Sequence, residues 1–219
     1  MTLPLRIGYL VPQFPGQTHI FFWREILALE EIGHDVHVLS TRRPPRGLIV
    51  HKWSDAAIAR TTFLVQPNVI HAATAAARLV PQGLPLWMAS GGAGFARDAL
   101  LALPAARALV TYARKHRLTH VHVHSLARAA VIAALARRMG GPSYSVTLHG
   151  PLSDYGPGQP FKWQGASFAT VITQKLAEEV RATLTTAVPD RLTVQAMGIC
   201  DGFHKCQQFQ RWVVVILFK

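Results

Sequence analysis

Short apolar segments alternate with helix-like segments along most of the sequence, and this alternation limits the possible fold more than any other feature. Residues 5–11 (LRIGYLV) and 35–40 (DVHVLS) are strand-like, and residues 20–32 between them repeat apolar side chains at spacings of three and four. That spacing predicts a helix with one buried face, whose polar positions are supplied by Glu25 and two later glutamates. Gly33 predicts the end of this helix.

The same pattern continues to about residue 196. Apolar strands that alternate with helices predict a parallel sheet covered on both faces, with right-handed connections, which is an α/β fold. The predicted strands are residues 62–65, 120–124, 144–148, 168–173 and 191–196, and the predicted helices are residues 68–80, 95–116, 126–139 and 176–184, with a break at Gly91, Gly92 and Gly94.

Polar residues follow several of the predicted strands. In an α/β sheet of this kind, ligands bind in the crevice beyond the carboxyl ends of the strands. His149 stands where strand 144–148 ends, and His124, Pro12 and Gly16 follow the ends of two other strands. If those strands are neighbours, we expect their loops to share one crevice.

The segment VTLHGPLSDYG, residues 146–156, combines hydrogen-bonding side chains with glycines. His149, Asp154 and Tyr155 lie beside Gly150 and a second glycine, Gly156. A histidine at this place can donate to a ligand oxygen, and its charge is adjustable near pH 7. It can equally cap its own loop, and the sequence leaves both interpretations open.

The segment FPGQTH, residues 14–19, places Gly16 and Gln17 just before Thr18, which we predict to cap the next helix. Backbone N–H groups at a helix start can hold phosphate or sugar hydroxyls. The segment lacks the glycines and the lysine of the common phosphate-binding motifs, so an ordinary strand-to-helix turn is the favoured interpretation.

The segment HVHVH, residues 120–124, has three histidines that alternate along a predicted strand and therefore share one face. Metal sites of this type usually add carboxylates or histidines from other strands, and acidic residues are scarce nearby. We therefore predict no metal. We expect His120 and His122 to pack or form hydrogen bonds, and His124 to emerge at the crevice.

Composition narrows the class of protein. Half of the 219 residues are apolar and 16% are charged, as in compact globular proteins. The net charge of +12 comes mostly from 17 scattered arginines, which favours a solvated surface with some attraction to anions or to an anionic membrane face. No basic stripe with interleaved aromatic residues occurs, so we expect no nucleic-acid partner.

The termini and cysteines suggest a compartment. Cys200 and Cys206 form no CxxC pair, which favours a reducing environment. The N-terminus lacks the pattern of a signal peptide, and no apolar run approaches the ~20 residues of a membrane span. We expect a cytoplasmic protein that can rest on the inner face of a membrane.

Taken in order, several segments resemble one family. The succession LRIGYLVPQFP, GHDVHVLS, HVHVHS, VTLHGPLSDYG, FATVIT and RLTVQAMG resembles the N-terminal domain of a family-four glycosyltransferase of the GT-B fold, over residues 5–199. The loop YGPGQPFKWQGASFATVIT is similar to enzymes that assemble bacterial exopolysaccharides.

The resemblance implies a Rossmann-like domain that holds the acceptor, and a retaining transfer from a nucleotide-sugar donor to a saccharide or lipid-linked acceptor. It places His149 near the transferred sugar as the catalytic residue, and the turn from Gly16 through Gln17 to Thr18 near the donor phosphates. It implies no cofactor. The predicted substrate contacts are completed by His124, Gly150, Asp154 and Tyr155.

The sequence also departs from this family. The second Rossmann-like domain with glutamates eight positions apart is expected after residue 198, where the sequence instead reads ICDGFHKCQQFQRWVVVILFK. We therefore predict a domain over residues 1–199 and an atypical tail over residues 200–219. A truncated gene, a frameshift and half of a split enzyme remain open.

Further expectations follow from this departure. The chain alone should not transfer sugar, and its apolar tail should promote self-association. Two alternatives remain: a non-catalytic module that binds sugar or protein, and a metal-dependent hydrolase that uses the HVHVH face.

Overall fold

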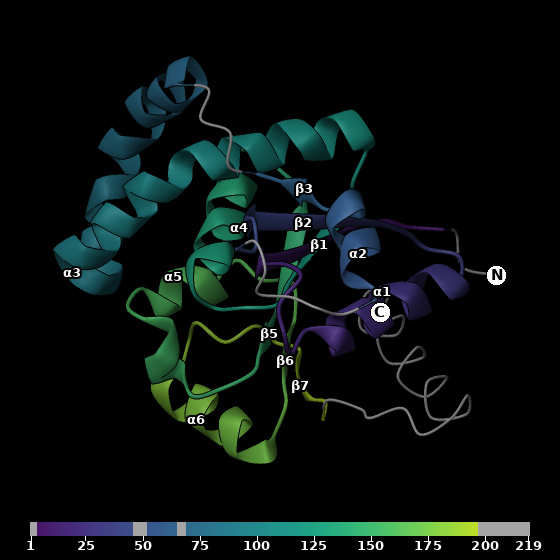
Figure 1. Cartoon of the computed structure of the whole chain (residues 1–219). Coiled ribbons are helices and arrows are strands. Elements are labelled where there is room, and N and C mark those ends of the chain that lie inside the picture. Colours follow the sequence, from purple (N-terminus) through teal and green to yellow (C-terminus); the bar gives the residue numbers. More distant parts are fainter. Residues whose placement is uncertain (1–3, 46–51, 65–68, 197–219) are drawn as a thin grey trace.

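Seven parallel strands form one sheet in the order β3-β2-β1-β4-β5-β6-β7. The computed structural model describes residues 4–45, 52–64 and 69–196, and within the last range it leaves out the side chains of residues 69–79 and 82. Figure 1 shows the sheet at the centre of the molecule, with helices around it. The predicted α/β, Rossmann-like fold is confirmed. The strands are β1 (Arg6–Gln13), β2 (Asp35–Arg42), β3 (Thr62–Phe63), β4 (His120–Val123), β5 (Ser143–Leu148), β6 (Ala169–Val171) and β7 (Leu192–Val194).

The chain order reverses direction across the sheet between β1 and β4. From β1 the chain runs outward through β2 to β3, and from β4 it runs the opposite way to β7. In sheets of this kind, the loops that follow such a pair of strands diverge, and ligands usually bind between them at the carboxyl edge.

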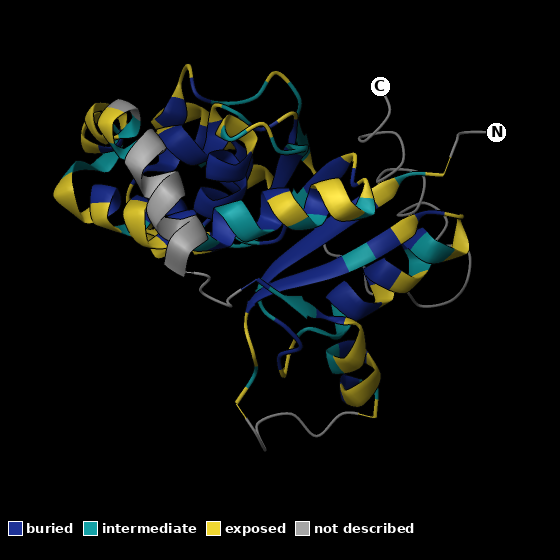
Figure 2. Cartoon of the chain, turned by 90° about the horizontal axis from the view of Figure 1, so that it is seen from above, coloured by how far each residue is buried: buried dark blue, intermediate teal, exposed yellow. Residues whose placement is uncertain are grey.

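Successive strand residues point to opposite faces of the sheet. Because both faces carry apolar side chains, helices cover both. In β1, Tyr9 and Val11 pack with α1 and α2, whereas Leu10 belongs to the larger core under the remaining helices. Figure 2 shows that the strands are largely buried and that the helices carry the exposed positions on their outer sides. The helices are α1 (Ile20–Glu31), α2 (Ser54–Arg60), α3 (Val69–His116), α4 (Arg128–Arg138), α5 (Gln159–Trp163) and α6 (Gln174–Leu184), with a 3-10 turn η1 (Leu152–Tyr155).

The span of α3 consists of two helices that meet at a bend, visible in Figure 1. Gly91 and Gly92 have non-helical dihedral angles, and Gly92 has a positive φ of 69°. The predicted break is therefore confirmed at these two glycines, whereas Gly94 lies within the second helix. The first helix extends through residues 81–90, beyond its predicted end.

Two expectations concern the chain ends and the membrane. The tail of residues 200–219, with both cysteines, lies outside the described residues. Within the described ranges, no helix is long and apolar enough to cross a bilayer.

Candidate functional site

The site lies where the carboxyl ends of β1, β4 and β5 meet. These three strands are adjacent in the sheet. The segment from Gly16 to His19 follows β1, His124 follows β4, and His149 follows β5. Adjacency of the strands therefore brings the three segments to one edge.

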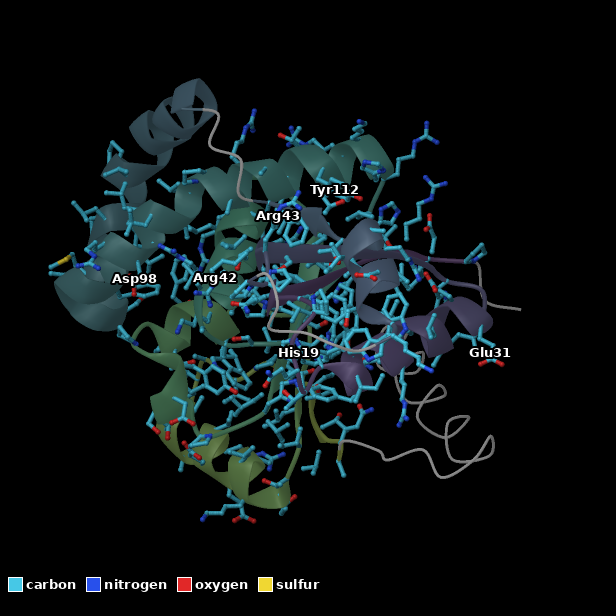
Figure 3. All side chains as sticks on the ribbon, viewed as in Figure 1. His19, Glu31, Arg42, Arg43, Asp98 and Tyr112 are labelled. Atoms are coloured by element: carbon cyan, nitrogen blue, oxygen red, sulfur yellow. The ribbon has the colours of Figure 1, made fainter. Side chains whose placement is uncertain are left out.

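The segment after β1 is shaped by His19, which sequence reasoning overlooked. A Cβ atom at Gly16 would lie 2.7 Å from the His19 ring, so the buried glycine makes room for the imidazole. The predicted cap at Thr18 is wrong: α1 begins at Ile20, His19 occupies the cap position, and its side chain makes no capping hydrogen bond. Gln17 and Thr18 are exposed at the surface of this turn. Figure 3 shows His19 near the centre of the molecule and Glu31, the last residue of α1, at the periphery.

His149 packs against the start of α1. Its ring centroid lies 5.9 Å from that of Phe21 and 5.5 Å from that of Phe22. On another side it stacks on His124, with His149 Nε2 and His124 Nδ1 3.3 Å apart. The structure therefore places His149 against the first turn of α1, close enough to His19 for the two side chains to interact electrostatically.

The loop after His149 folds back on itself. A Cβ atom at Gly150 would lie 3.5 Å from Asp154 Oδ2 and 3.6 Å from the Tyr155 hydroxyl, so these three residues are grouped together. Asp154 is exposed and Tyr155 is partly buried. Burial raises the pKa of Tyr155, and a hydrogen bond to the backbone of His149 partly opposes the rise.

Two partly buried hydrogen bonds that the sequence did not indicate hold this loop. Lys162 Nζ donates a hydrogen bond of 2.8 Å to the backbone oxygen of Tyr155, and Glu179 Oε1 accepts one of 2.8 Å from the backbone of Leu152. Lys162 is only 2% exposed, and burial lowers its pKa to about 8. The two contacts connect the loop to α5 and α6.

The expectation that His124 emerges at the crevice is wrong. Its side chain is 3% exposed and is enclosed by Tyr9 and Phe22, whose ring centroids lie 4.4 and 4.6 Å away. His124 therefore supports His149 from beneath and does not present its ring to a ligand in solution.

The other two histidines of the HVHVH segment bond to hydroxyl groups on the neighbouring strand. His120 contacts the hydroxyls of Ser143 and Ser145 at 2.8 and 2.7 Å. His122 contacts the hydroxyls of Ser145 and Thr147 at 2.7 and 2.9 Å. Both ring nitrogens of each histidine thus have hydroxyl partners across the sheet.

One group of side chains has spacing compatible with a metal. Among the described residues, Glu25, His122 and His124 each offer a ligand atom, and these atoms lie within 4.8 Å of one another. A metal would have to displace a hydroxyl from His122, because both of its nitrogens already have partners. We therefore interpret the group as part of a hydrogen-bonded network and not as a metal centre.

Glu25 is the residue of this network that the sequence analysis misplaced. It was expected at a polar position of α1, but it is 9% exposed and faces the sheet. Its Oε2 atom accepts a hydrogen bond of 2.7 Å from the Tyr9 hydroxyl and lies 3.7 Å from His124 Nε2. The sequence did contain a signal of this burial, because Glu25 lies within the apolar stripe of the helix, between Phe22 and Ile26.

Burial controls the charge of these groups. It lowers the pKa of His149 to about 4, and it lowers the pKa of His124 well below the ordinary value, with smaller contributions from neighbouring histidines. It raises the pKa of Glu25 to about 7, although the Tyr9 hydrogen bond opposes this rise. At neutral pH, therefore, His149 and His124 are uncharged.

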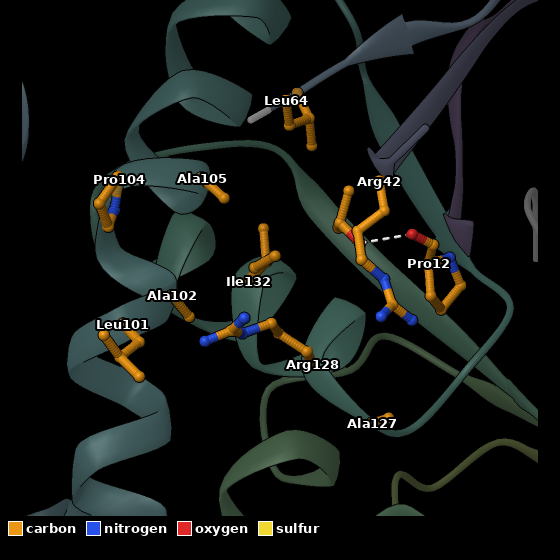
Figure 4. Close-up of a pocket in the computed structure, with 11 residues that line it drawn as sticks. Pro12, Arg42, Leu64, Leu101, Ala102, Pro104, Ala105, Ala127, Arg128 and Ile132 are labelled. Atoms are coloured by element: carbon orange, nitrogen blue, oxygen red, sulfur yellow. Dashed lines mark hydrogen bonds between the residues drawn. The ribbon is translucent and has the colours of Figure 1, made fainter. Parts of the chain in front are cut away.

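A cavity of about 580 Å³ lies at the same edge of the sheet, between α3 and the ends of β1 and β2. Figure 4 shows the guanidinium groups of Arg42 and Arg128 pointing into this space, opposite an apolar wall of α3. The other lining residues are Pro12, Thr41, Leu64, Leu101, Ala102, Pro104, Ala105, Ala127 and Ile132, none of which is acidic.

Comparison with solved structures identifies the same fold elsewhere. Sucrose-phosphate synthase from Thermosynechococcus elongatus superposes with a TM-score of 0.50 at 14% identity, over 95% of this chain and 99% of that chain. A second structure of that synthase gives a TM-score of 0.52 at 14% identity, over 86% of this chain. This chain spans 47% of the second synthase chain, about half of its length.

Comparison at the level of sequence identifies the family. The family described as "Glycosyl transferase 4-like domain" matches residues 21–201, which is most of the chain. A search of curated proteins found no match. The matched range covers α1 from its second residue, the loops of His124 and His149, and every strand from β2 to β7. The chain belongs to the glycosyl transferase 4-like domain family.

Proposed function

We propose that this domain takes part in retaining transfer of a sugar from a nucleotide-sugar donor to a saccharide or lipid-linked acceptor, in bacterial exopolysaccharide biosynthesis. The observation that carries the proposal is the position of His149 at the carboxyl end of β5, against the first turn of α1 and next to His124. A neutral imidazole held by packing can orient a sugar oxygen without placing a cation beside the reacting centre.

The surrounding residues support a division of roles. We assign the donor phosphates to the turn of Gly16, Gln17 and Thr18, next to the start of α1, where no His19 side-chain bond caps the helix. We assign acceptor hydroxyls to the grouped Gly150, Asp154 and Tyr155. His124 acts through His149, because it is buried beneath it.

The cavity beside the site supports an acceptor that is both anionic and partly apolar. Arg42 and Arg128 supply positive charge, and Leu64, Leu101 and Ile132 supply apolar surface. A phosphate or pyrophosphate attached to a lipid or hydrophobic carrier has both properties. No lining residue offers a carboxylate to neutralise the arginines, so the cavity favours an anion.

Exposed apolar residues on α3 support a contact with a membrane surface that carries such an acceptor. Leu100 and Leu101 are 44% and 53% exposed, and Leu101 also lines the cavity. The net charge of +12 would favour an anionic membrane. Among the described side chains of α3, Leu84, Leu86 and Met88, which lie before the bend, are also exposed.

Transfer requires a second, donor-side half in this proposal. The chain spans 47% of a full synthase chain that shares its fold. We assign residues 1–199 to one acceptor-side domain. The donor-side half would act either in the same longer polypeptide or as a separate chain. A non-catalytic binding module would bind an acceptor but would release no nucleotide from any donor.

The test is a transfer assay with a form that includes a donor-side half. We expect His149→Ala to lower kcat/KM for nucleotide-sugar turnover at least a hundredfold. Asp190→Asn, a change at the opposite edge of the sheet, should have no effect. Equal activity of wild type and His149→Ala would overturn the assignment of His149, and absence of turnover with every donor would favour the binding module.

A further inference from the structure

A chain of polar side chains runs beneath the aromatic residues of the site. The Tyr9 hydroxyl donates to Glu25 Oε2 at 2.7 Å, and the same oxygen lies 3.7 Å from His124 Nε2. On the other side of its ring, His124 Nδ1 lies 3.3 Å from His149 Nε2. These four side chains thus connect β1, α1, the end of β4 and the loop after β5.

The two middle side chains of this series, Glu25 and His124, are enclosed by protein. The side chains of Glu25 and His124 are 10% and 3% exposed. His124 Nε2 faces the Glu25 carboxylate, but at 3.7 Å it makes no hydrogen bond to any described residue. A buried polar atom without a partner costs about 1–3 kcal/mol, so its place beside a buried carboxyl group calls for an explanation.

The contact between the two histidines couples their protons. A neutral imidazole carries a proton on one nitrogen and a lone pair on the other. If His124 carries its proton on Nε2, its Nδ1 accepts, and the 3.3 Å contact requires His149 to donate from Nε2. If His124 carries its proton on Nδ1, it donates to His149 Nε2, and the proton of His149 then resides on Nδ1.

We propose that Glu25 is a positioning residue that selects, through His124, which ring nitrogen of His149 carries the proton. An ionised Glu25 attracts the His124 proton to Nε2, so His149 has its own proton on Nε2 and a lone pair on Nδ1. A protonated Glu25 can donate to His124 Nε2, so the arrangement reverses and His149 has a proton on Nδ1.

The surroundings allow this exchange near neutral pH. Burial raises the pKa of Glu25 to about 7, whereas the pKa of His149 is lowered to about 4, chiefly by burial. Between pH 6 and 8.5, therefore, Glu25 changes charge while His149 stays neutral. The titratable groups that face Glu25 are Tyr9 on β1, His122 on β4 and His124 just after β4. His19 and His149 lie beyond them.

The tautomer of His149 affects how it can bind a substrate. This catalytic consequence rests on the proposed function. With a proton on Nδ1, that atom of His149 is a hydrogen-bond donor. With a lone pair on Nδ1, the same atom is an acceptor. Glu25 would therefore determine which polar group His149 can orient, although it does not touch the substrate.

The experiment measures imidazole nitrogen signals by NMR in the 219-residue chain labelled with ¹⁵N at histidine. These signals distinguish a protonated nitrogen from one with a lone pair, and they can be read in solution or in a sedimented sample. His124→Asn and His149→Asn assign the signals. Glu31→Gln serves as the control, because Glu31 is an exposed glutamate on the same helix.

We expect the major tautomer of His149 to change from Nε2–H at pH 8.5 to Nδ1–H at pH 6 in the wild type and in Glu31→Gln. Glu25→Gln should show Nδ1–H at both values, because the glutamine amide can donate to His124 Nε2. His124→Asn should abolish the response to pH. The wild-type series requires no substitution, so it stands even if a variant does not fold.

An unchanged His149 tautomer across this pH range, with the same tautomer in Glu25→Gln, would overturn the inference. A response that persists in His124→Asn would also overturn it, because the effect would then bypass His124. The measurement uses no donor or acceptor. Failure of the proposed transfer activity is therefore distinguishable from failure of the tautomer selection.

Discussion

Gly158 packs directly against the ring of Phe95. A Cβ atom at this glycine would come within 2.2 Å of two ring carbons, and the φ of Gly158 is +76°. The Gly158 backbone nitrogen also lies 2.8 Å from the position of a Cβ atom on Gly91, at the bend of α3. The loop that follows His149 is therefore fixed to the bend by close approach of backbone to backbone and backbone to ring.

We predict that Gly158→Ala lowers the free energy of unfolding by more than about 2 kcal/mol, because the methyl group meets a buried ring and the positive φ adds strain. Gly156→Ala is the matched control, since Gly156 also has a positive φ of 70° but nothing lies within 4 Å of its Cβ position. That variant should lose only about 1 kcal/mol from strain. Urea unfolding measures both values, and equal losses would contradict the packing argument.

The buried histidines predict a loss of stability in acid. Burial lowers the pKa of His120 and His149 to about 4 and of His122 to about 3, and that of His124 falls well below its ordinary value. The folded chain keeps these four groups neutral, whereas the unfolded chain binds protons below about pH 6.5. Stability is therefore present above about pH 6.5 and is lost as pH falls toward 4.

Glu25 acts in the opposite direction, because its pKa is raised to about 7. Its contribution is present in acid and is lost as pH rises from about 4.5 to 7. Since one carboxyl group opposes four histidines, the urea midpoint should fall between pH 6.5 and 5, with a slope of about 1.4 kcal/mol per pH unit for each net proton. His120→Asn should reduce this slope, and a midpoint that rises in acid would contradict the prediction.

The Glu25, His122 and His124 group predicts little metal in the purified chain. Because both nitrogens of His122 bond to hydroxyls, we expect elemental analysis to find substoichiometric metal. A chelator should leave the melting temperature unchanged, since no bound metal stabilises the folded state. One tightly bound zinc per chain, lost with a fall in melting temperature, would show that these residues ligate a metal.

The two arginines of the cavity predict a specific effect on the acceptor. In a form with transfer activity, Arg42→Gln and Arg128→Gln should each raise KM for an anionic acceptor about tenfold or more, because a hydrogen bond to a charged group contributes about 1.5–3 kcal/mol. Arg43→Gln is the control, since Arg43 packs over Phe63 and does not line the cavity. An equal effect of all three changes would indicate general electrostatic attraction only.

The strands and the edge that carries the site were predictable because both depend on local pattern. Apolar runs such as residues 144–148 fix a buried strand, and a parallel sheet places every strand end at a common edge. The structure added that β1, β4 and β5 are adjacent in the sheet, which brings their loops together. The sequence pattern alone could not establish them, since they depend on the order of strands in the sheet.

The contacts within the site depend on residues distant in sequence, and here the prediction failed. Glu25 looks like a solvated position until Tyr9 and His124 are seen opposite it. Thr18 looks like a cap until His19 is found packed on Gly16, with the helix starting one residue later. Neither outcome follows from helix periodicity or capping preference, because tertiary packing selected both.

The last prediction is that the 219-residue chain alone does not transfer sugar. In the proposed enzyme the donor is held between two halves, and contacts to its nucleotide and diphosphate come largely from the donor-side half. Without them the alignment that can supply ~7–11 kcal/mol of the barrier is lost, so turnover should be undetectable. The exposed apolar residues of α3, Leu100 and Leu101 among them, should at the same time promote self-association. The purified chain is incubated with a panel of nucleotide sugars and lipid-linked acceptors, and nucleotide release and mass by light scattering are measured in parallel. Release that exceeds the control without protein and disappears in His149→Ala would contradict the first expectation, and a monomer at high concentration would contradict the second.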